Sequence, residues 1–392
     1  MKANWEYKKL GDVCTIERGG SPRPIEKFIT DSPDGLNWIK IGDAVEGSKY
    51  ITSTKEKIKP EGLKKTRFVH KGDFILSNSM SFGRPYILGI DGCIHDGWLV
   101  IHDDKSIFDK SYLYYVLGSP NMYLEFKRLA VGGVVNNLNS QLVRNVKVAI
   151  PPLDEQQRIV AELDLLTGII DKQNAQLKEF DTLAQSIFYD MFGDPIENEK
   201  GWEVKKLEEV CAKIVDCPHS TPKKVDYKTN YPCIRTSELK GGSISWDSMQ
   251  YLEKEEYEIR IARLKPIAGD IVFGREGTIG DAVILPEGFC FSLGQRTMLL
   301  RAESSLVLNY FLHRTLMSDW VKRQIDAVNV SSTVAHLNIK DFRQFDIPVP
   351  PLALQQSFAD KIQSIENQKA KIKASIADTQ KLLDYTMDKY FG

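Results

Sequence analysis

Residues 5–14 read WEYKKLGDVC, and residues 202–211 read WEVKKLEEVC. The same offset of 197 residues pairs further glycines, aspartates and a cysteine, and after a two-residue insertion the offset becomes 199. At this second offset PPL at 151–153 pairs with PPL at 350–352, and QQ at 156–157 pairs with QQ at 355–356. An ordered series of matches at nearly constant spacing indicates an internal duplication. The sequence therefore predicts two similar halves.

Each half divides into two parts of different composition. Residues 1–150 and 196–349 contain short apolar runs separated by Gly, Pro, Asn and Asp, which predicts strands and turns with a few helices. Residues 151–195 and 350–392 open around Pro-Pro-Leu, and the stretches 154–192 and 353–391 contain no proline, which predicts one long helix in each. We therefore expect an α+β fold, with two similar mixed α/β domains separated by two long helices.

Apolar residues recur at alternating steps of three and four inside both predicted helices. This 3.5-residue period indicates a helix that packs lengthwise against another helix. Pairing of the two helices with each other is favoured because both copies keep one phase, although each helix could instead lie on its own domain. Gln173 and Lys369 interrupt the pattern and could fix its register or face a partner. The predicted apolar seam comprises Leu163, Leu166, Ile170, Leu177, Phe180, Ile187, Ile362, Ile365, Ile372, Ile376 and Leu383.

Charge, hydropathy and cysteine usage restrict the class of protein. The 52 Lys and Arg against 53 Asp and Glu leave a net charge of −1, which excludes nucleic-acid binding through bulk charge, so any such surface must be local. No apolar run approaches the roughly 18 residues of a membrane helix, and we expect a cytoplasmic protein without membrane contact. Six cysteines without a Cys-x-x-Cys pair do not form a disulfide framework. Cys217 and His219 allow a metal site, but small buried side chains are the favoured interpretation, and no metal is expected.

Motifs of common catalytic sites are missing from the sequence. It has no dinucleotide or phosphate-loop glycine pattern, no H-E-x-x-H and no G-x-S-x-G. None of the six histidines falls at an equivalent position in both halves, which argues against a catalytic histidine common to them. We therefore expect no catalytic residues in this chain. Two alternatives stay open: a self-contained DNA-modifying enzyme (nuclease or methyltransferase) with unrecognised motifs, and a coiled-coil adaptor with protein-binding domains.

Two clusters of basic residues stand out against the neutral background. Lys and Arg can displace the counterions that surround DNA phosphates, so these residues are candidates for phosphate contact. A solvated charged face is the equally acceptable structural explanation. The candidates are Lys55, Lys57, Lys59, Lys64, Lys65 and Arg67 in the first half, and Lys223, Lys224, Arg260 and Arg263 in the second.

Polar and glycine-rich loops occupy equivalent places in the two halves. SNSMSFGR at 77–84 matches GREGTIGD at 274–281, and GGVVNN at 132–137 matches SSTVAH at 331–336. Arg, Asn, Gln and Ser pair with base edges in the major groove, and equivalent loops with different contents are expected of two readers of different sequences. Tight turns that need glycine explain Gly83 and Gly280 but not the varied polar residues. The candidates for base contact are Asn78, Ser79, Arg84, Asn136, Asn137, Arg275, Gln295, Arg296 and His336.

Over its whole length the chain resembles the specificity subunits of type I restriction–modification systems. The resemblance rests on the duplicated WExKKL opening, the PPLxxQQ helix start, the closing FG and CPHSTPK at 217–223. It implies that residues 1–150 and 196–349 are target recognition domains, each reading one half of a bipartite target in double-stranded DNA. It also implies that the helices at 151–195 and 350–392 are spacers that pack as an antiparallel coiled coil with approximate twofold symmetry and set the unread gap.

The resemblance further implies the partners of the chain. Two methyltransferase subunits would dock on it and modify adenine with S-adenosylmethionine. Restriction subunits would join through the complex and add ATP-driven translocation and cleavage with Mg²⁺. The chain itself would bind none of these cofactors.

Overall fold

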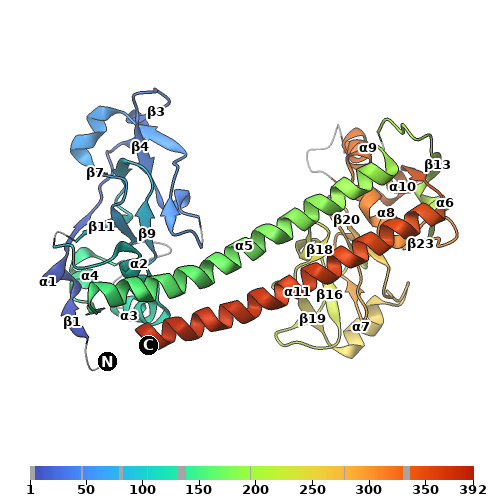
Figure 1. The fold of residues 1–392 in the computed structure, drawn as a ribbon. Helices are drawn as coiled ribbons and strands as arrows, with labels where there is room; N and C mark the ends of the chain where they lie inside the picture. Colours follow the sequence, from blue (N-terminus) through green and yellow to red (C-terminus); the bar gives the residue numbers. More distant parts are fainter. Residues whose placement is uncertain are drawn as a thin grey trace. The chain divides into compact units, whose positions relative to one another are not determined.

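The computed structural model describes residues 5–392 apart from positions 46, 79–82, 104, 131–137, 195, 278 and 330–335. The chain forms two compact units, one made of Met1–Asn174 with Ala374–Gly392 and the other of Ala175–Lys373. Each unit contains one mixed α/β domain and part of each long helix, which confirms the predicted fold class (Figure 1).

The described part of the first domain contains two five-stranded sheets and a separate strand pair. In the first sheet the strand order is β2 (Thr15–Arg18), β11 (Trp98–His102), β8 (Phe74–Ser77), β9 (Pro85–Leu88) and β5 (Tyr50–Ile51). In the second it is β3 (Ile29–Thr30), β6 (Glu56–Ile58), β4 (Leu36–Ile39), β10 (Gly92–Ile94) and β7 (Arg67–Val69). The pair is β1 (Glu6–Lys9) with β12 (Lys147–Ile150). The helices are α1 (Leu10–Val13), α2 (Lys110–Gly118), α3 (Pro120–Ala130) and α4 (Ser140–Arg144), with short 3₁₀ helices at Ile25–Lys27, Ile41–Asp43 and Pro60–Lys65.

The second domain repeats this plan with shorter sheets. One described sheet has the order β14 (Cys211–Asp216), β23 (Thr297–Ala302), β20 (Ile271–Gly274) and β21 (Ala282–Ile284). Another has the order β15 (Lys224–Val225), β19 (Gln250–Leu252), β16 (Pro232–Ile234) and β22 (Ser292–Leu293). Two strand pairs are β13 (Glu203–Lys206) with β24 (Asp346–Val349), and β17 (Leu239–Lys240) with β18 (Ser243–Ile244). The helices are α6 (Leu207–Val210), α7 (Lys254–Arg260), α8 (Asn309–Leu316), α9 (Asp319–Asn329) and α10 (Ile339–Arg343), with a 3₁₀ turn at Thr236–Glu238.

The repeated WExKKL motif has the same structural task in both domains. Its residues form β1 and β13, which pair antiparallel with β12 and β24 just before each long helix. The leucine of the motif is fully buried as Leu10 and Leu207. The N–H of Leu10 donates to the carbonyl of Val146, and the N–H of Leu207 donates to that of Phe345, both at 2.8 Å. The motif therefore recurs because it fixes the chain at the start of each domain to the strand at its end.

The first glutamine of each Gln-Gln pair anchors a long helix to its domain. Gln156 is fully buried, and its Nε2 donates to the carbonyls of Ile107 at 3.0 Å and Pro151 at 2.9 Å. Its Oε1 accepts from the N–H of Asp109 at 2.8 Å. The same three bonds occur in the second domain, where the fully buried Gln355 joins Leu306, Pro350 and Leu308. A buried amide with every partner supplied explains why the residue recurs.

The two long helices, α5 (Leu153–Phe192) and α11 (Leu352–Phe391), pack antiparallel within each unit (Figure 1). In the first unit the hydroxyl of Tyr390 donates to Glu162 at 2.6 Å, and Gln173 donates to Ser375 at 2.7 Å. In the second unit Lys369 donates to Asp181 at 2.8 Å, and the rings of Phe188 and Phe358 lie 5.7 Å apart. As the residue number increases along α5, the residue number of its contact on α11 therefore decreases. The predicted antiparallel pairing of the two helices is confirmed.

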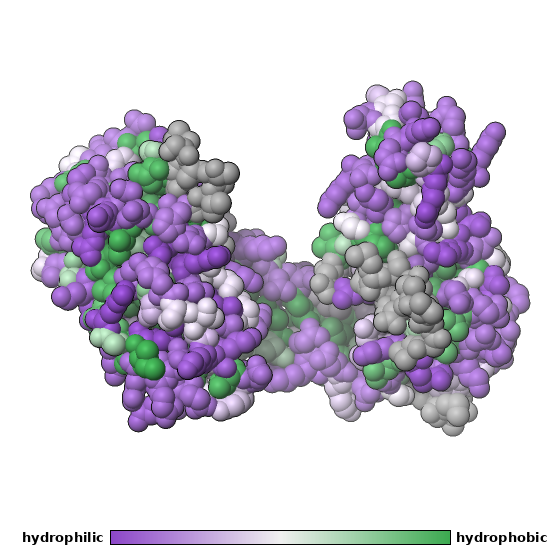
Figure 2. Space-filling view, turned by 180° about the vertical axis from the view of Figure 1, so that it is seen from behind, coloured by the Kyte–Doolittle hydropathy of each residue, from purple (hydrophilic) through white to green (hydrophobic). Residues whose placement is uncertain are grey.

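The residues of the predicted seam occupy the less exposed positions of both helices. All eleven are buried or half-buried, whereas most positions between them are exposed. Leu163 belongs to the core of the first unit together with Tyr390, and Ile362 and Ile365 belong to the core of the second together with Phe358. Elsewhere the visible surface is mostly hydrophilic (Figure 2). In the part of the chain that the structure describes, no helix is long and apolar enough to cross a membrane.

Candidate nucleic-acid interface

The register of one sheet collects polar residues at one end of the second domain. Gly274, the last residue of β20, is paired with Thr297, the first residue of β23. Arg275 and Glu276 therefore leave the sheet where Gln295 and Arg296 enter it. Asp216, which ends β14, faces Met298 in the same sheet, and His336 forms an isolated bridge with Glu276. We call Asp216, His219, Arg275, Glu276, Gln295, Arg296 and His336 the second-domain cluster.

The inner part of this cluster is an ion pair that is mostly withdrawn from water. The Arg275 Nε lies 3.4 Å from Asp216 Oδ1, and His219 Nε2 lies 3.4 Å from Asp216 Oδ2. Within the described residues, neither Arg275 Nε nor Asp216 Oδ1 makes a hydrogen bond. Arg275 is buried, so the expectation that it contacts a base directly is corrected. Its backbone instead helps to position the outer residues, because its N–H donates to the carbonyl of Arg296 and its carbonyl accepts from the N–H of Leu337, next to His336.

The outer part of the cluster is organised around Glu276. One carboxylate oxygen lies 3.1 Å from Nε of Arg296, and the other lies 2.7 Å from Nδ1 of His336. Arg296 is exposed and has a φ of 67°, a left-handed conformation that favours glycine. Gln295 is half-buried and donates to the carbonyl of His219 at 2.8 Å. Arg296 and His336 therefore remain as the exposed polar side chains among the predicted residues here.

The first domain has a comparable group at the equivalent sheet end, where Ser77 of β8 pairs with Trp98 of β11. Asn78 is buried, and its Nδ2 donates to the carbonyl of Asp96 at 3.0 Å. It is therefore a brace between the two strand ends, which corrects the expectation of a base contact by Asn78. The residues at the surface are Arg18, Ser21, Arg23 and Asp96, which we call with Asn78 the first-domain cluster.

Asp96 is the organising carboxylate of the first-domain cluster. The Ser21 hydroxyl donates to Asp96 Oδ1 at 2.7 Å and holds the pKa of that carboxyl below its ordinary value, with further contributions from His95 and Arg18. Arg18 Nε donates to the Asp96 carbonyl at 2.9 Å, and Arg23 places a guanidinium nitrogen 3.6 Å from Asp96 Oδ2. Asp96 is therefore ionised at neutral pH and holds two cationic side chains. No motif in the sequence pointed to this group, although Asp96 aligns with Gln295 at the offset of 199.

The remaining base-contact candidates are not brought into these clusters. Ser79, Asn136 and Asn137 lie outside the described residues. Arg84 is exposed and lines a cavity of about 460 Å³ together with Tyr114 and Met387. Gly83 and Gly280 have φ values of 76° and 96°, so their turns do require glycine.

Most of the basic phosphate-contact candidates are accessible. Lys55, Lys59, Lys64 and Lys65 are exposed, whereas Lys57 and Arg67 are half-buried, and Arg67 pairs with Glu17 at 2.9 Å. In the second domain the exposed candidates are Lys223, Lys224 and Arg263. These side chains can approach a polyanion, and their contacts with phosphate stay a prediction.

The expectation that Arg260 contacts a DNA phosphate is corrected. It is buried at the end of α7, where its guanidinium donates to the carbonyl of Leu293 at 2.8 and 3.0 Å and to that of Ser220 at 3.2 Å. Glu256 lies 3.7 Å away and balances its charge. Because its donors are used by the backbone, Arg260 ties the loop after β14 to β22 and is not available for a phosphate.

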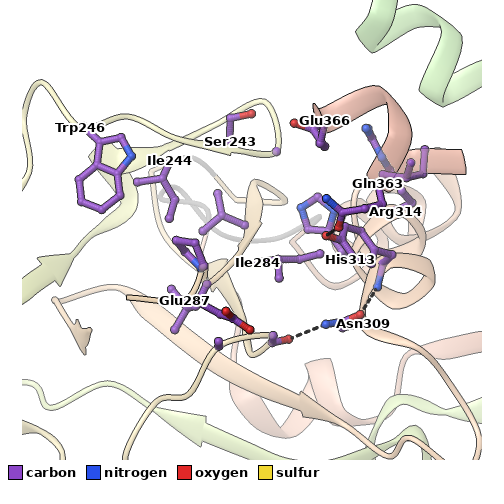
Figure 3. A pocket seen from close by; sticks show the side chains of 18 of the residues that line it. Ser243, Ile244, Trp246, Ile284, Glu287, Asn309, His313, Arg314, Gln363 and Glu366 are labelled. Atoms are coloured by element: carbon purple, nitrogen blue, oxygen red, sulfur yellow. Dashed lines mark hydrogen bonds between the residues drawn. The ribbon is translucent and has the colours of Figure 1, made fainter. Parts of the chain in front are cut away.

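A cavity of about 900 Å³ lies in the second unit between α8, β18, β21 and α11. His313 and Arg314 reach it from α8, while Gln363 and Glu366 reach it from α11 (Figure 3). Burial lowers the pKa of His313 to about 4, so the ring is neutral at pH 7, and its Nε2 is bonded to the carbonyl of Ala282 at 3.0 Å. The imidazole therefore supports the fold between α8 and β21.

Metal-ligating side chains do not gather in the residues that the structure describes, where no group of three could hold an ion. All six cysteines are free thiols. Cys217 is fully buried, and burial raises its pKa, whereas His219 is exposed and faces Asp216.

Comparison with known proteins adds the family relationship. A family model described as the type I restriction modification DNA specificity domain matches residues 2–179 and 199–379. The MjaVIII specificity subunit of a type I restriction enzyme from Methanocaldococcus jannaschii is 22% identical over 384 residues, covering 93% of this chain and 86% of that protein. The type I restriction enzyme EcoBI specificity subunit from Escherichia coli is 20% identical over 391 residues, covering 92% of this chain and 79% of that protein. The crystal structure of a type I system S subunit from M. genitalium superposes with a TM-score of 0.56 at 13% identity, covering 100% of this chain and 98% of that one, and shares its fold.

Proposed function

Since this chain belongs to the family of type I restriction modification DNA specificity domains, we propose that it reads the DNA target for a type I restriction–modification complex. The observation that carries this proposal is the pair of polar clusters at equivalent sheet ends. Asp96 and Arg23 stand in one domain, and Glu276 and Arg296 stand in the other. Equivalent scaffolds with different polar side chains suit two domains that read different half-sites.

The paired helices are proposed to set the unread gap between the half-sites. A helix of 40 residues is about 60 Å long. Half-sites one helical turn apart are about 34 Å from centre to centre. Polar contacts at different heights, Gln173 with Ser375 and Lys369 with Asp181, support a fixed register between the helices. A fixed register would make the gap a property of the protein.

Two methyltransferase subunits are the proposed partners, and duplicated apolar surface supports two equivalent docking places. Leu183 and Leu382 are equivalent at the offset of 199, and both are exposed on the long helices. Leu153 and Leu352, at the helix starts, form a second equivalent exposed pair. Two copies of one partner would bury such pairs in the same way.

The catalytic activities are proposed to reside in partner subunits. S-adenosylmethionine would be bound by the methyltransferase subunits, and ATP and Mg²⁺ by the restriction subunits, with the assembly acting on DNA in the cytoplasm. This chain would contribute target choice and would carry out no reaction of its own.

Methylation mapping at single-molecule resolution tests the proposal. Cells that express the methyltransferase subunits with this chain should methylate a motif of two short blocks separated by a constant unread gap. Cells that express the methyltransferase subunits alone should not methylate that motif. One continuous block, or the same methylation without this chain, would contradict the proposal.

A further inference from the structure

One arginine in each cluster is both strongly exposed and held by a carboxylate. In the first domain the Arg23 side chain is 81% exposed, and a terminal guanidinium nitrogen lies 3.6 Å from Asp96. In the second domain the Arg296 side chain is 63% exposed, and its Nε lies 3.1 Å from Glu276. In both cases the carboxylate engages one side of the guanidinium and leaves other N–H groups directed away from it.

Each of these carboxylates is itself fixed by a second partner. Asp96 accepts from the Ser21 hydroxyl at 2.7 Å, and Glu276 lies 2.7 Å from Nδ1 of His336. Both carboxylates are less exposed than the arginines that they hold. A carboxylate that is fixed by a second partner restricts the rotamers of the arginine side chain beside it. Less conformational entropy is therefore lost when that arginine binds a ligand.

The two arrangements lie at the same end of equivalent sheets. Asp96 precedes Gly97, whose carbonyl accepts from the N–H of Asn78, and Arg296 supplies the equivalent carbonyl to Arg275. Arg296 therefore stands where the first domain has glycine, and its own backbone is left-handed, a conformation that glycine adopts easily. Such strain in a non-glycine residue concentrates at functional sites.

We propose that Arg23 and Arg296 each read one guanine, one in each half-site, and that Asp96 and Glu276 are their positioning residues. The proposal rests on the proposed function. Guanine presents two acceptors, O6 and N7, on its major-groove edge, and a guanidinium supplies two parallel donors that match them. Adenine, cytosine and thymine do not present this pair of acceptors.

A base contact is favoured over a phosphate contact because each arginine already lies beside a carboxylate. This carboxylate offsets part of the local positive charge and would repel a phosphate, which weakens the electrostatic attraction that dominates backbone contacts. The remaining N–H groups still keep the geometry that a base edge needs. The exposed side chains of Lys64 and Lys65 are better suited to phosphates.

Methylation mapping with arginine variants of the full complex tests this inference. Arg296→Gly removes the side chain while suiting the backbone φ of 67°, so it should fold normally. It should reduce the preference for guanine at one position of one half-site by roughly 10- to 100-fold and leave the other half-site unchanged. Arg23→Ala should do the same in the other half-site. Glu276→Gln should relax the same position as Arg296→Gly, but less, and the double variant should match Arg296→Gly.

Arg128 provides a matched control, because it is an exposed arginine of α3 that pairs with Glu125 at 2.7 Å and does not belong to the first-domain cluster. Arg128→Ala should leave the motif unchanged. An equal loss of methylation on all sequences in the Arg23 and Arg296 variants, no change in either, or a half-site without a G·C pair would overturn the inference. If the unaltered complex gives no two-block motif, the proposed function itself fails, and the two failures are thereby distinguished.

Discussion

Gln156 offers a sharp test of how the helices are anchored, because its amide makes three buried hydrogen bonds. Gln156→Leu keeps a similar volume but leaves two carbonyls and one N–H without this partner. Each buried polar group left unpaired costs about 1–3 kcal/mol, so partial relaxation should bring the total loss to about 3–5 kcal/mol. For a unit of this size that loss corresponds to a fall in melting temperature of roughly 6–20 °C.

The chain supplies its own control beside each buried glutamine. Gln157 and Gln356 follow directly and are exposed, so Gln157→Leu and Gln356→Leu should change the free energy of unfolding by less than about 0.5 kcal/mol. Gln355→Leu should lose as much stability as Gln156→Leu because its three bonds are the same. Chemical denaturation monitored by circular dichroism measures all four variants. Equal stability of Gln156→Leu and Gln157→Leu would refute the anchoring role.

Three further outcomes are expected. In chemical denaturation, the free energy of unfolding of Lys369→Met should stay within about 1 kcal/mol of that of the natural protein, because Asp181 and Glu366 keep contact with water. Lys369→Glu should lower it by about 3 kcal/mol, because the new side chain brings three carboxylates together. Equal effects of the two variants would contradict the role of the buried ion pair. The pKa of His313 is lowered to about 4 in the folded chain, so between pH 6.5 and pH 4 the unfolded chain binds a proton that the folded chain does not. The free energy of unfolding should therefore fall as the pH decreases across this interval, by about 3 kcal/mol at most. His313→Gln should remove that part of the acid sensitivity while the exposed His70→Gln keeps it, and identical pH profiles would count against the assignment. Arg260→Ala should lower the melting temperature without changing the base preference. Arg263→Ala should instead weaken DNA binding on all sequences and reduce the salt dependence of binding. The reverse pattern would show that the roles of the two arginines are exchanged.

The large features of this fold were predictable because they depend on buried residues that recur. Leu10 and Leu207 fill the same place in the two domains, and so do Gln156 and Gln355, so the same packing and hydrogen-bonding requirements apply to both copies. The helix seam was predictable for the same reason, since its period follows directly from the geometry of two packed helices.

The candidate site was only partly predictable, because strand register brings its members together. Arg296 and His336 could be selected from their loops, but their carboxylate, Glu276, could be identified only when the structure placed it between them. Arg23 and Asp96 are 73 positions apart, and no local pattern connects them. Arg260 looked like a surface cation because its acceptors, Leu293 and Ser220, come from distant parts of the chain.

We propose that the two similar domains read separate half-sites and that the antiparallel pairing of the long helices gives these half-sites opposite orientation. This proposal is tested most directly by a chain in which residues 5–150 replace residues 202–349, so that both domains are copies of the first. Methylation mapping of its complex should show the first block twice, as an inverted repeat across an unread gap of constant length. A motif that keeps the second block, or that repeats the first block in direct orientation, would contradict the proposal.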